Sequence, residues 1–126
     1  MAGKKILIID DDPSVLACYE RLFRREGYDP FLETDGTAAE SRLNEYRDVE
    51  VVILDYRMPG INGLELLRRL RGRDFRARIV LVSGHFSPEI VLAARKLGIR
   101  WIFSKPVDTA RLLSAVAESF GSPPVP

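Results

Sequence analysis

Residues 4–15 read Lys-Lys-Ile-Leu-Ile-Ile-Asp-Asp-Asp-Pro-Ser-Val, and this stretch decides the fold. Four apolar residues, Ile6–Ile9, are followed directly by three aspartates, Asp10–Asp12. The short β-branched run predicts a strand buried on both faces, which is typical of a parallel sheet. Asp12 before Pro13 predicts a helix start, because aspartate caps the free amides of a first turn and proline fits that turn. A buried strand is therefore expected to enter a helix through an acidic turn.

The same alternation of strand and helix continues along the chain. Three more apolar runs predict buried strands: Val51–Leu54, Ile79–Val82 and Trp101–Phe103. Tyr28–Glu33 predicts a weaker strand at a sheet edge, because Pro30 cannot donate a ladder hydrogen bond. Helical spacing marks five stretches: Val15–Glu26; Ala39, Leu43 and Tyr46; Leu64, Leu67 and Leu70; Ser87 to Gly98; and Asp108 to Phe120. Five βα units predict an α/β, doubly wound five-stranded parallel sheet, and the edge strand fits the order 2-1-3-4-5.

Length and composition limit the classes of function. The 126 residues, 46% hydrophobic and 29% charged, predict one domain over residues 4–120 and a disordered tail or start of a linker over 121–126. Nineteen basic against eighteen acidic residues argue against nucleic-acid binding as the main activity. The single cysteine, Cys18, excludes internal disulfides, and we expect it on the inward face of the first helix. Apolar runs of about five residues cannot span a bilayer or form a signal peptide, so the cytoplasm is the expected compartment.

Polar residues follow the predicted strands at the point where each strand ends. Asp10 and Asp11 follow the first strand, Asp55 the third, Ser83 the fourth and Lys105 the fifth. The carboxyl ends of parallel strands meet at one edge, so these groups are expected to share a crevice. Three carboxylates there favour a hard divalent cation such as Mg²⁺. An aspartate beside Mg²⁺ and a lysine can accept a phosphoryl group.

Each of these residues also has a structural interpretation. Asp12 is best explained as the helix cap, Ser83 alone fits a turn hydroxyl, and Lys105 alone fits a surface cation. Their ordered occurrence at successive strand ends favours the site over the separate explanations.

Four segments in this order resemble the receiver domain of two-component response regulators, which is also called CheY-like. The segments are ILIIDDDPSV, VVILDYRMPGINGLELL, LVSG and GIRWIFSKPV. The resemblance covers about residues 4–120 and implies a flavodoxin-like (βα)5 fold. It also implies two-component phosphorelay signalling.

The resemblance implies a role for each site residue. Asp55 is the implied phosphoacceptor, and Ser83 and Lys105 are implied to contact the phosphoryl group. Asp11 is implied to ligate Mg²⁺ directly and Asp10 mainly through water, with Asp55 and the backbone carbonyl of Arg57 as further ligands. A cis peptide between Lys105 and Pro106 is implied as well.

The sequence departs from the family pattern at the switch positions. The family often has an aromatic residue three positions before the lysine, but that position is Ile102 here and Trp101 lies one place earlier. This departure places the usual aromatic coupling in doubt, and Ile102 is better explained as a core residue. Arg57 and His85, two residues after Asp55 and Ser83, are expected to modulate access to the phosphoryl group, although a lone loop histidine is more often a plain surface residue.

The function implied is a phospho-accepting switch that receives its phosphoryl group from a sensor histidine kinase or a phosphotransfer protein. Phosphorylation is expected to reshape the face formed by the helix over 87–97, the strand Trp101–Phe103 and the helix over 108–120. An output domain or a second copy would read that face. The domain is not expected to be an enzyme beyond assisting its own phosphorylation and dephosphorylation, nor to bind nucleic acid or a membrane.

Two alternatives stay open on the sequence. Asp10-x-Asp12-x-Ser14 resembles the first motif of haloacid-dehalogenase phosphatases, with Ser83 and Lys105 as the later motifs. That hypothesis lacks an acidic pair after Lys105 and leaves Asp55 unexplained. A pseudo-receiver, an interaction module that is never phosphorylated, is the other alternative, although the acidic pair, the acceptor and the lysine are all present.

Overall fold

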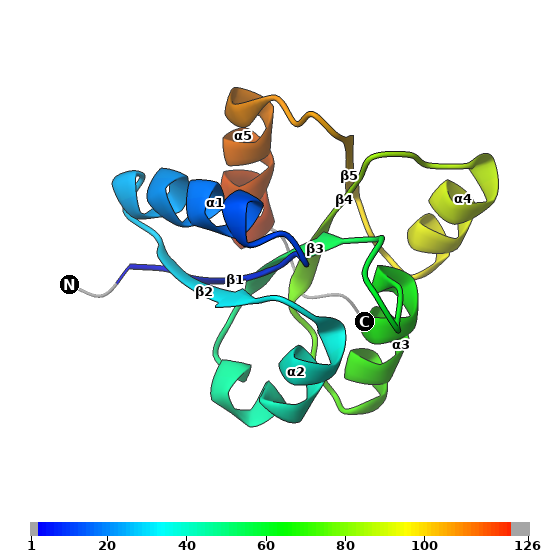
Figure 1. The fold of residues 1–126 in the computed structure, drawn as a ribbon. Helices are drawn as coiled ribbons and strands as arrows, with labels where there is room; N and C mark the ends of the chain where they lie inside the picture. Colours follow the sequence, from blue (N-terminus) through cyan, green and yellow to red (C-terminus); the bar gives the residue numbers. More distant parts are fainter. Residues whose placement is uncertain (1–2, 122–126) are drawn as a thin grey trace.

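The computed structural model describes residues 3–121, whose strands form one five-stranded parallel sheet (Figure 1). The strands are β1 (Lys5–Ile9), β2 (Asp29–Glu33), β3 (Val51–Asp55), β4 (Arg78–Ser83) and β5 (Trp101–Ser104). Their order is β2-β1-β3-β4-β5, and every neighbouring pair is parallel. The predicted class, strand order and edge position of β2 are confirmed.

The helices lie on both faces of the sheet. They are α1 (Pro13–Arg25), α2 (Gly36–Ser41), α3 (Gly63–Gly72), α4 (Pro88–Lys96) and α5 (Thr109–Phe120). Successive strand residues face opposite layers: Ile6 and Ile8 pack with residues of α1 and α5, whereas Leu7 and Ile9 pack with residues of α2, α3 and α4. A polar side chain caps the first turn of each α-helix: Asp12, Asp35, Asn62, Ser87 and Asp108.

The second predicted helix is two elements. α2 ends at Ser41, and a 3₁₀ helix, η1 (Leu43–Tyr46), follows. Leu43 and Tyr46 are both buried, but a spacing of three fits a 3₁₀ turn as well as an α-helix, so the pattern did not distinguish them. Tyr46 donates a hydrogen bond to the buried carboxylate of Glu33, which ties η1 to the end of β2. Burial and this bond raise the pKa of Tyr46 to about 12.

The inward placement of Cys18 is wrong. Its side chain is exposed, whereas Leu16 and Phe23 are the buried residues of α1. Cys18 follows Leu16 by two positions, which turns it about 200° around the helix, away from the buried stripe.

The edge strand β2 contains Pro30, paired with Ile6 of β1. The amide of Asp29 donates inward to the carbonyl of Lys4 at 2.9 Å. Because successive residues of a strand alternate, the nitrogen of Pro30, which has no hydrogen, lies on the outer edge.

Within residues 3–121, every helix is too short or too polar to cross a membrane. The predicted tail falls mainly on residues 122–126, which lie outside the described residues.

Candidate functional site

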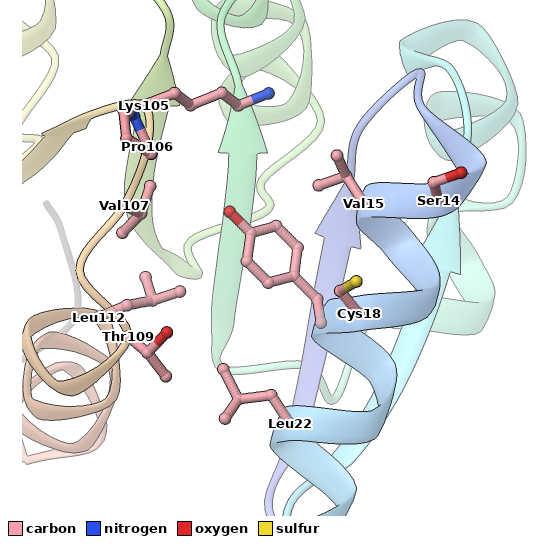
Figure 2. Close-up of a pocket in the computed structure, with 10 residues that line it drawn as sticks. Ser14, Val15, Cys18, Leu22, Lys105, Pro106, Val107, Thr109 and Leu112 are labelled. Carbon is pink, nitrogen blue, oxygen red and sulfur yellow. The ribbon is translucent and has the colours of Figure 1, made fainter.

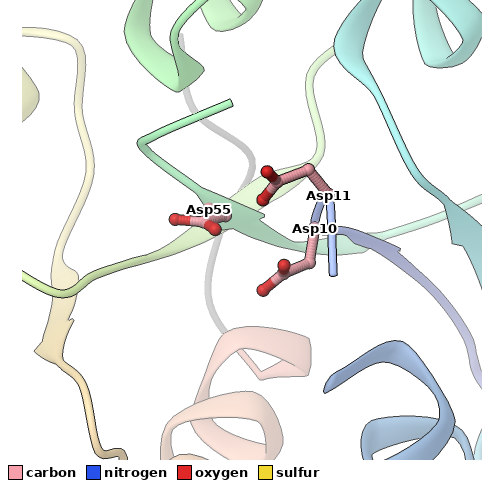
Figure 3. Close-up of side chains that lie close together, drawn as sticks. All are labelled: Asp10, Asp11 and Asp55. Atoms are coloured by element: carbon pink, nitrogen blue, oxygen red, sulfur yellow. The ribbon is translucent and has the colours of Figure 1, made fainter. Parts of the chain in front are cut away.

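Three aspartates from two strand ends meet at the carboxyl edge of the sheet (Figure 3). Asp10 and Asp11 follow β1, and Asp55 is the last residue of β3. Carboxylate oxygens, one from each, lie within 4.8 Å of one another. Asp10 and Asp55 are buried, at 2% and 5% exposed, whereas Asp11 is open to solvent. The predicted convergence of these residues is confirmed.

Lys105 bridges the two buried carboxylates. Its Nζ donates to Asp10 Oδ2 at 3.1 Å and to Asp55 Oδ2 at 3.2 Å. The backbone amide of Lys105 donates to the carbonyl of Ser83 at 2.8 Å, which anchors the base of the lysine side chain to β4. The peptide bond between Lys105 and Pro106 is cis, as the family resemblance implied.

The charges of this site are incompletely balanced. Burial raises the pKa of Asp55, the neighbouring Asp10 raises it further, and the bonds from Lys105 only partly oppose these effects. Burial alone would lower the pKa of Lys105, but its bonds to Asp10 and Asp55 outweigh burial and raise it. The lysine is therefore held as a cation, while Asp55 sits where its own negative charge is disfavoured.

Backbone amides hold the two buried carboxylates in place. The amide of Asp12 donates to Asp10 Oδ1 at 2.9 Å, and that of Arg57 donates to Asp55 Oδ1 at 3.2 Å. The amide of Asp10 donates to the carbonyl of Glu33 at 3.1 Å. Glu33 was not predicted as part of the site, although its position at the end of β2, beside β1, was a signal for it.

Gly63 brings the start of α3 against the acceptor strand. A Cβ at this position would lie 2.9 Å from the backbone oxygen of Asp55, closer than side chains normally approach. The amide of Gly63 donates to the carbonyl of Tyr56 at 2.8 Å. Only glycine allows this approach, which explains the glycine in the turn after the acceptor.

Ser83 lies at the end of β4, fully buried, and its hydroxyl is bonded within its own loop. Its Oγ donates to the carbonyl of His85 at 3.1 Å and accepts from the amide of His85 at 3.3 Å. The side chain is therefore near the strand ends that carry the aspartates, but it is engaged with the backbone that leads to α4.

The other predicted residues occupy three different environments. Arg57 and His85 are exposed in loops at this edge. Ile102 packs with the α2, α3 and α4 layer. Trp101 packs with the opposite α1 and α5 layer, and its indole nitrogen donates to Glu118 at 3.3 Å. Neighbouring residues of β5 face opposite sides of the sheet. The ring of Trp101 therefore does not replace the aromatic ring that the family often has at the position of Ile102.

A groove of about 310 Å³ begins at Lys105 and runs between α1 and the start of α5 (Figure 2). Apolar side chains of both elements form most of its wall, among them Val15, Leu22, Val107 and Leu112. Cys18 lines it as well, which explains an apolar side chain on the exposed flank of α1. This groove was missed because Val15, Cys18 and Leu22 fit the spacing of a buried stripe.

The donor set fits a hard divalent cation. All three converging groups are carboxylates, which are the ligands that Mg²⁺ prefers, and Asp11 leaves the cluster open to water. Sulfur and imidazole, which favour softer metals, are absent from this cluster.

Comparison with known proteins gives one consistent result. The family model described as the response regulator receiver domain matches residues 6–117. Sporulation initiation phosphotransferase F of Bacillus subtilis is 29% identical, covering 92% of this chain and 93% of that protein. The transcriptional regulatory protein FixJ of Azorhizobium caulinodans is 33% identical, and the match covers 90% of this chain but 54% of FixJ.

Solved structures agree with this result. A CheX–CheY–BeF₃–Mg²⁺ complex from Borrelia burgdorferi contains a chain 26% identical to this one, with a TM-score of 0.85 over 94% of this chain and 90% of that chain. A CheY-like receiver domain from Methanospirillum hungatei, 24% identical, matches the fold with a TM-score of 0.87 over 95% of both chains. These relatives indicate a phospho-accepting signalling switch and do not favour a dehalogenase-type phosphatase or an unphosphorylated module. The chain belongs to the response regulator receiver domain family.

Proposed function

We propose that Asp55 is the phosphoacceptor of this switch and that its phosphoryl donor is a sensor histidine kinase or a phosphotransfer protein. One observation carries the proposal: Lys105 Nζ contacts Asp55 at 3.2 Å and Asp10 at 3.1 Å, with Asp11 in the same cluster. The carboxylate of Asp55 thus lies where one cation is fixed and a second, divalent cation can be held.

In the transfer step, a carboxylate oxygen of Asp55 attacks the phosphorus of a phosphohistidine. The new O–P bond forms as the P–N bond breaks, and the electron pair of that bond leaves with the imidazole. Lys105 then pairs with a phosphoryl oxygen, and the amide of Arg57, which donates to Asp55 Oδ1 at 3.2 Å, orients the acceptor. This chain supplies positioning and charge, so it assists its own phosphorylation and later hydrolysis without being an enzyme for another substrate.

The metal proposed for this site is Mg²⁺. Asp10, Asp11, Asp55 and the backbone carbonyl of Arg57 would hold it. When bound, Mg²⁺ neutralises charge that develops on the transferred phosphoryl group. The CheX–CheY complex that resembles this chain contains Mg²⁺ together with BeF₃, which supports the assignment.

The phosphoryl donor is proposed to dock in the groove between α1 and α5. The groove is apolar along its length, yet it begins at Lys105, which itself contacts Asp55. A partner helix seated there would bring its phosphohistidine to the acceptor. An apolar helix face on the donor is the chemistry that complements this wall.

The output of the switch is proposed to lie on the face formed by α4, β5 and α5. Ser83 would donate to the phosphoryl group and draw the β4–α4 loop toward Asp55. Trp101 and Phe103 of β5 line a hollow beside α5 on this face. An output domain or a second copy of the chain would read the change.

Arg57 and His85 would modulate the lifetime of the phosphorylated form. Direct nucleic-acid or membrane binding is not proposed, and the cytoplasm remains a prediction.

The test is incorporation of phosphate from acetyl phosphate with Mg²⁺, followed by intact-protein mass spectrometry. The wild-type chain is expected to gain one phosphoryl group, and Asp55→Asn is expected to gain none. Asp12→Asn is the matched control, because it removes the same charge one residue from the cluster while asparagine keeps the helix cap. Phosphate on Asp55→Asn, or none on the wild-type chain, would contradict the proposal. Multiple turnover on a phosphate ester, abolished by Asp10→Asn but not by Asp55→Asn, would instead support a phosphatase.

A further inference from the structure

The hydroxyl of Ser83 cannot serve two acceptors at once. In this structure its only hydrogen is donated to the carbonyl of His85, within a closed turn that the amide of His85 completes. A phosphoryl group on Asp55 would need the same hydrogen. Under the proposed function, phosphorylation would therefore open the turn over residues 83–85 and release the segment that leads to α4.

Phe86, the next residue, contacts the acceptor strand through Tyr56. The two ring centroids are 6.5 Å apart and the planes are inclined by 51°. Both rings are half-buried and pack against the same core layer. Tyr56 directly follows Asp55, and Phe86 follows Ser83 by three residues. The pair thus connects the segment after the acceptor with the segment after the hydroxyl.

The two rings differ in how firmly the backbone holds them. The amide of Tyr56 donates to the carbonyl of Val82 at 2.8 Å, and its carbonyl accepts from Gly63 at 2.8 Å. Phe86 lies in the loop that depends on the turn closed by Ser83, and Ser87, the cap of α4, follows it. Tyr56 is therefore held by its backbone on both sides, whereas Phe86 lies on the segment that opening of the turn would move.

We propose that the ring pair Tyr56–Phe86 transmits phosphorylation of Asp55 to the start of α4. The inference rests on the proposed function and adds two positioning residues to it. Ile102 faces the same layer as the pair but has no ring, and Trp101 and Phe103 pack with the opposite layer. The contact between Tyr56 and Phe86 is a ring contact that spans these two segments.

The experiment follows backbone amide shifts of α4 by NMR before and after phosphorylation with acetyl phosphate and Mg²⁺. Phosphate uptake is measured on the same samples by intact mass. The variants are Phe86→Leu and Tyr56→Leu, with Phe86→Met as a second, more flexible apolar replacement and Phe86→Tyr as the variant that keeps a ring. Phe31→Leu is the matched control, because Phe31 forms a similar ring pair with Tyr46, centroids 6.0 Å apart, at the far edge of the sheet.

All variants are expected to take up phosphate. The wild-type chain, Phe86→Tyr and Phe31→Leu are expected to shift the amides of residues 88–96, and the Leu and Met variants of the pair are expected to lose that shift. Shifts that persist in the variants of the pair, or that disappear equally in Phe31→Leu, would overturn the inference while leaving Asp55 as acceptor. Absence of uptake by the wild-type chain would overturn the proposed function, and this inference with it.

Discussion

Charged side chains have different partners at the amino ends and at the carboxyl ends of the strands. At the amino ends of β3 and β4, the half-buried guanidinium of Arg71 donates to the carbonyls of Phe75 and Ala77 at 2.7 and 3.0 Å. At the carboxyl ends, three carboxylates surround one ammonium group, that of Lys105. At the first end, Nη1 and Nη2 of Arg71 are thus bonded to main-chain carbonyls, although its buried Nε has no hydrogen-bond partner among the described residues. The second end keeps an excess of negative charge that a ligand can balance, so it is the end suited to binding and chemistry.

Burial disfavours the charged form of a side chain at both ends of the sheet, but the interactions that offset this effect differ between the two ends. Burial, together with the nearby Arg76, lowers the pKa of Arg71 to about 10, so the guanidinium is still charged at neutral pH. Its hydrogen bonds close the turn between α3 and β4. Asp55, in contrast, keeps a raised pKa even with Lys105 bonded to it. We therefore expect substitutions at the carboxyl end to change chemistry, and those at the amino end to change stability.

The largest effect is expected for Lys105→Met, which removes the fixed cation beside the acceptor. Loss of one group that stabilises transition-state charge typically slows a reaction by about 10²–10³-fold. The rate of phosphate uptake from acetyl phosphate should fall on that scale, as measured by time-resolved intact mass. Lys96→Met, on an exposed position of α4, is the control and should keep the wild-type rate. An unchanged rate in Lys105→Met would contradict the expectation that substitutions at the carboxyl ends of the strands change the chemistry.

A smaller effect, on stability alone, is expected for Arg71→Met. The variant leaves the carbonyls of Phe75 and Ala77 without their donor, and unpaired buried acceptors cost about 1–3 kcal/mol each. Relief of the buried charge offsets part of this, so the free energy of unfolding should fall by about 2 kcal/mol in urea titrations. Arg68→Met, exposed on the same helix, should change it by less than about 0.5 kcal/mol. A loss of phosphate uptake in folded Arg71→Met would contradict the expectation that substitutions at the amino ends of the strands change stability and leave the chemistry intact.

The smallest effect has the opposite sign. Asp55→Asn removes one of three mutually repelling carboxylates, so without metal the variant should be more stable than the wild-type chain. We expect a gain of about 1 kcal/mol in the free energy of unfolding, the scale on which functional sites trade stability for activity. The measurement is a urea titration in EDTA, with Asp12→Asn as the control for loss of an aspartate. A less stable Asp55→Asn would show that the bond from Lys105 outweighs repulsion and burial.

The parallel sheet and the acidic cluster could be predicted from the sequence for a simple physical reason, whereas the residues indicated only the edge position of β2 and left the full strand order open. Buried parallel strands are short apolar runs, and polar residues that end such runs collect at one edge. Asp10, Asp55 and Lys105 are each the kind of residue that interrupts an apolar run or follows it directly. Their meeting therefore followed from the fold class without knowledge of any loop.

The remaining features depend on geometry that periodicity does not describe. The break between α2 and η1 was missed because a spacing of three residues fits both helix types. The contact between Tyr56 and Phe86 joins two irregular segments, where no repeat predicts which side chains meet. The Ser83 hydroxyl can donate either to a nearby backbone carbonyl, as it does to that of His85, or to a bound ligand. The sequence is compatible with both hydrogen bonds, so it did not predict which one forms.

Pro30 has a consequence for the behaviour of the protein at high concentration. An edge strand with a full row of outward amides is a template on which another chain can add a strand, which is a route to aggregation. On β2 one of these outward donors is missing, because the nitrogen of Pro30 lies on the outer side. A foreign strand added at this edge would lack a donor beside Pro30, the second residue of β2, so self-association by sheet extension is discouraged there.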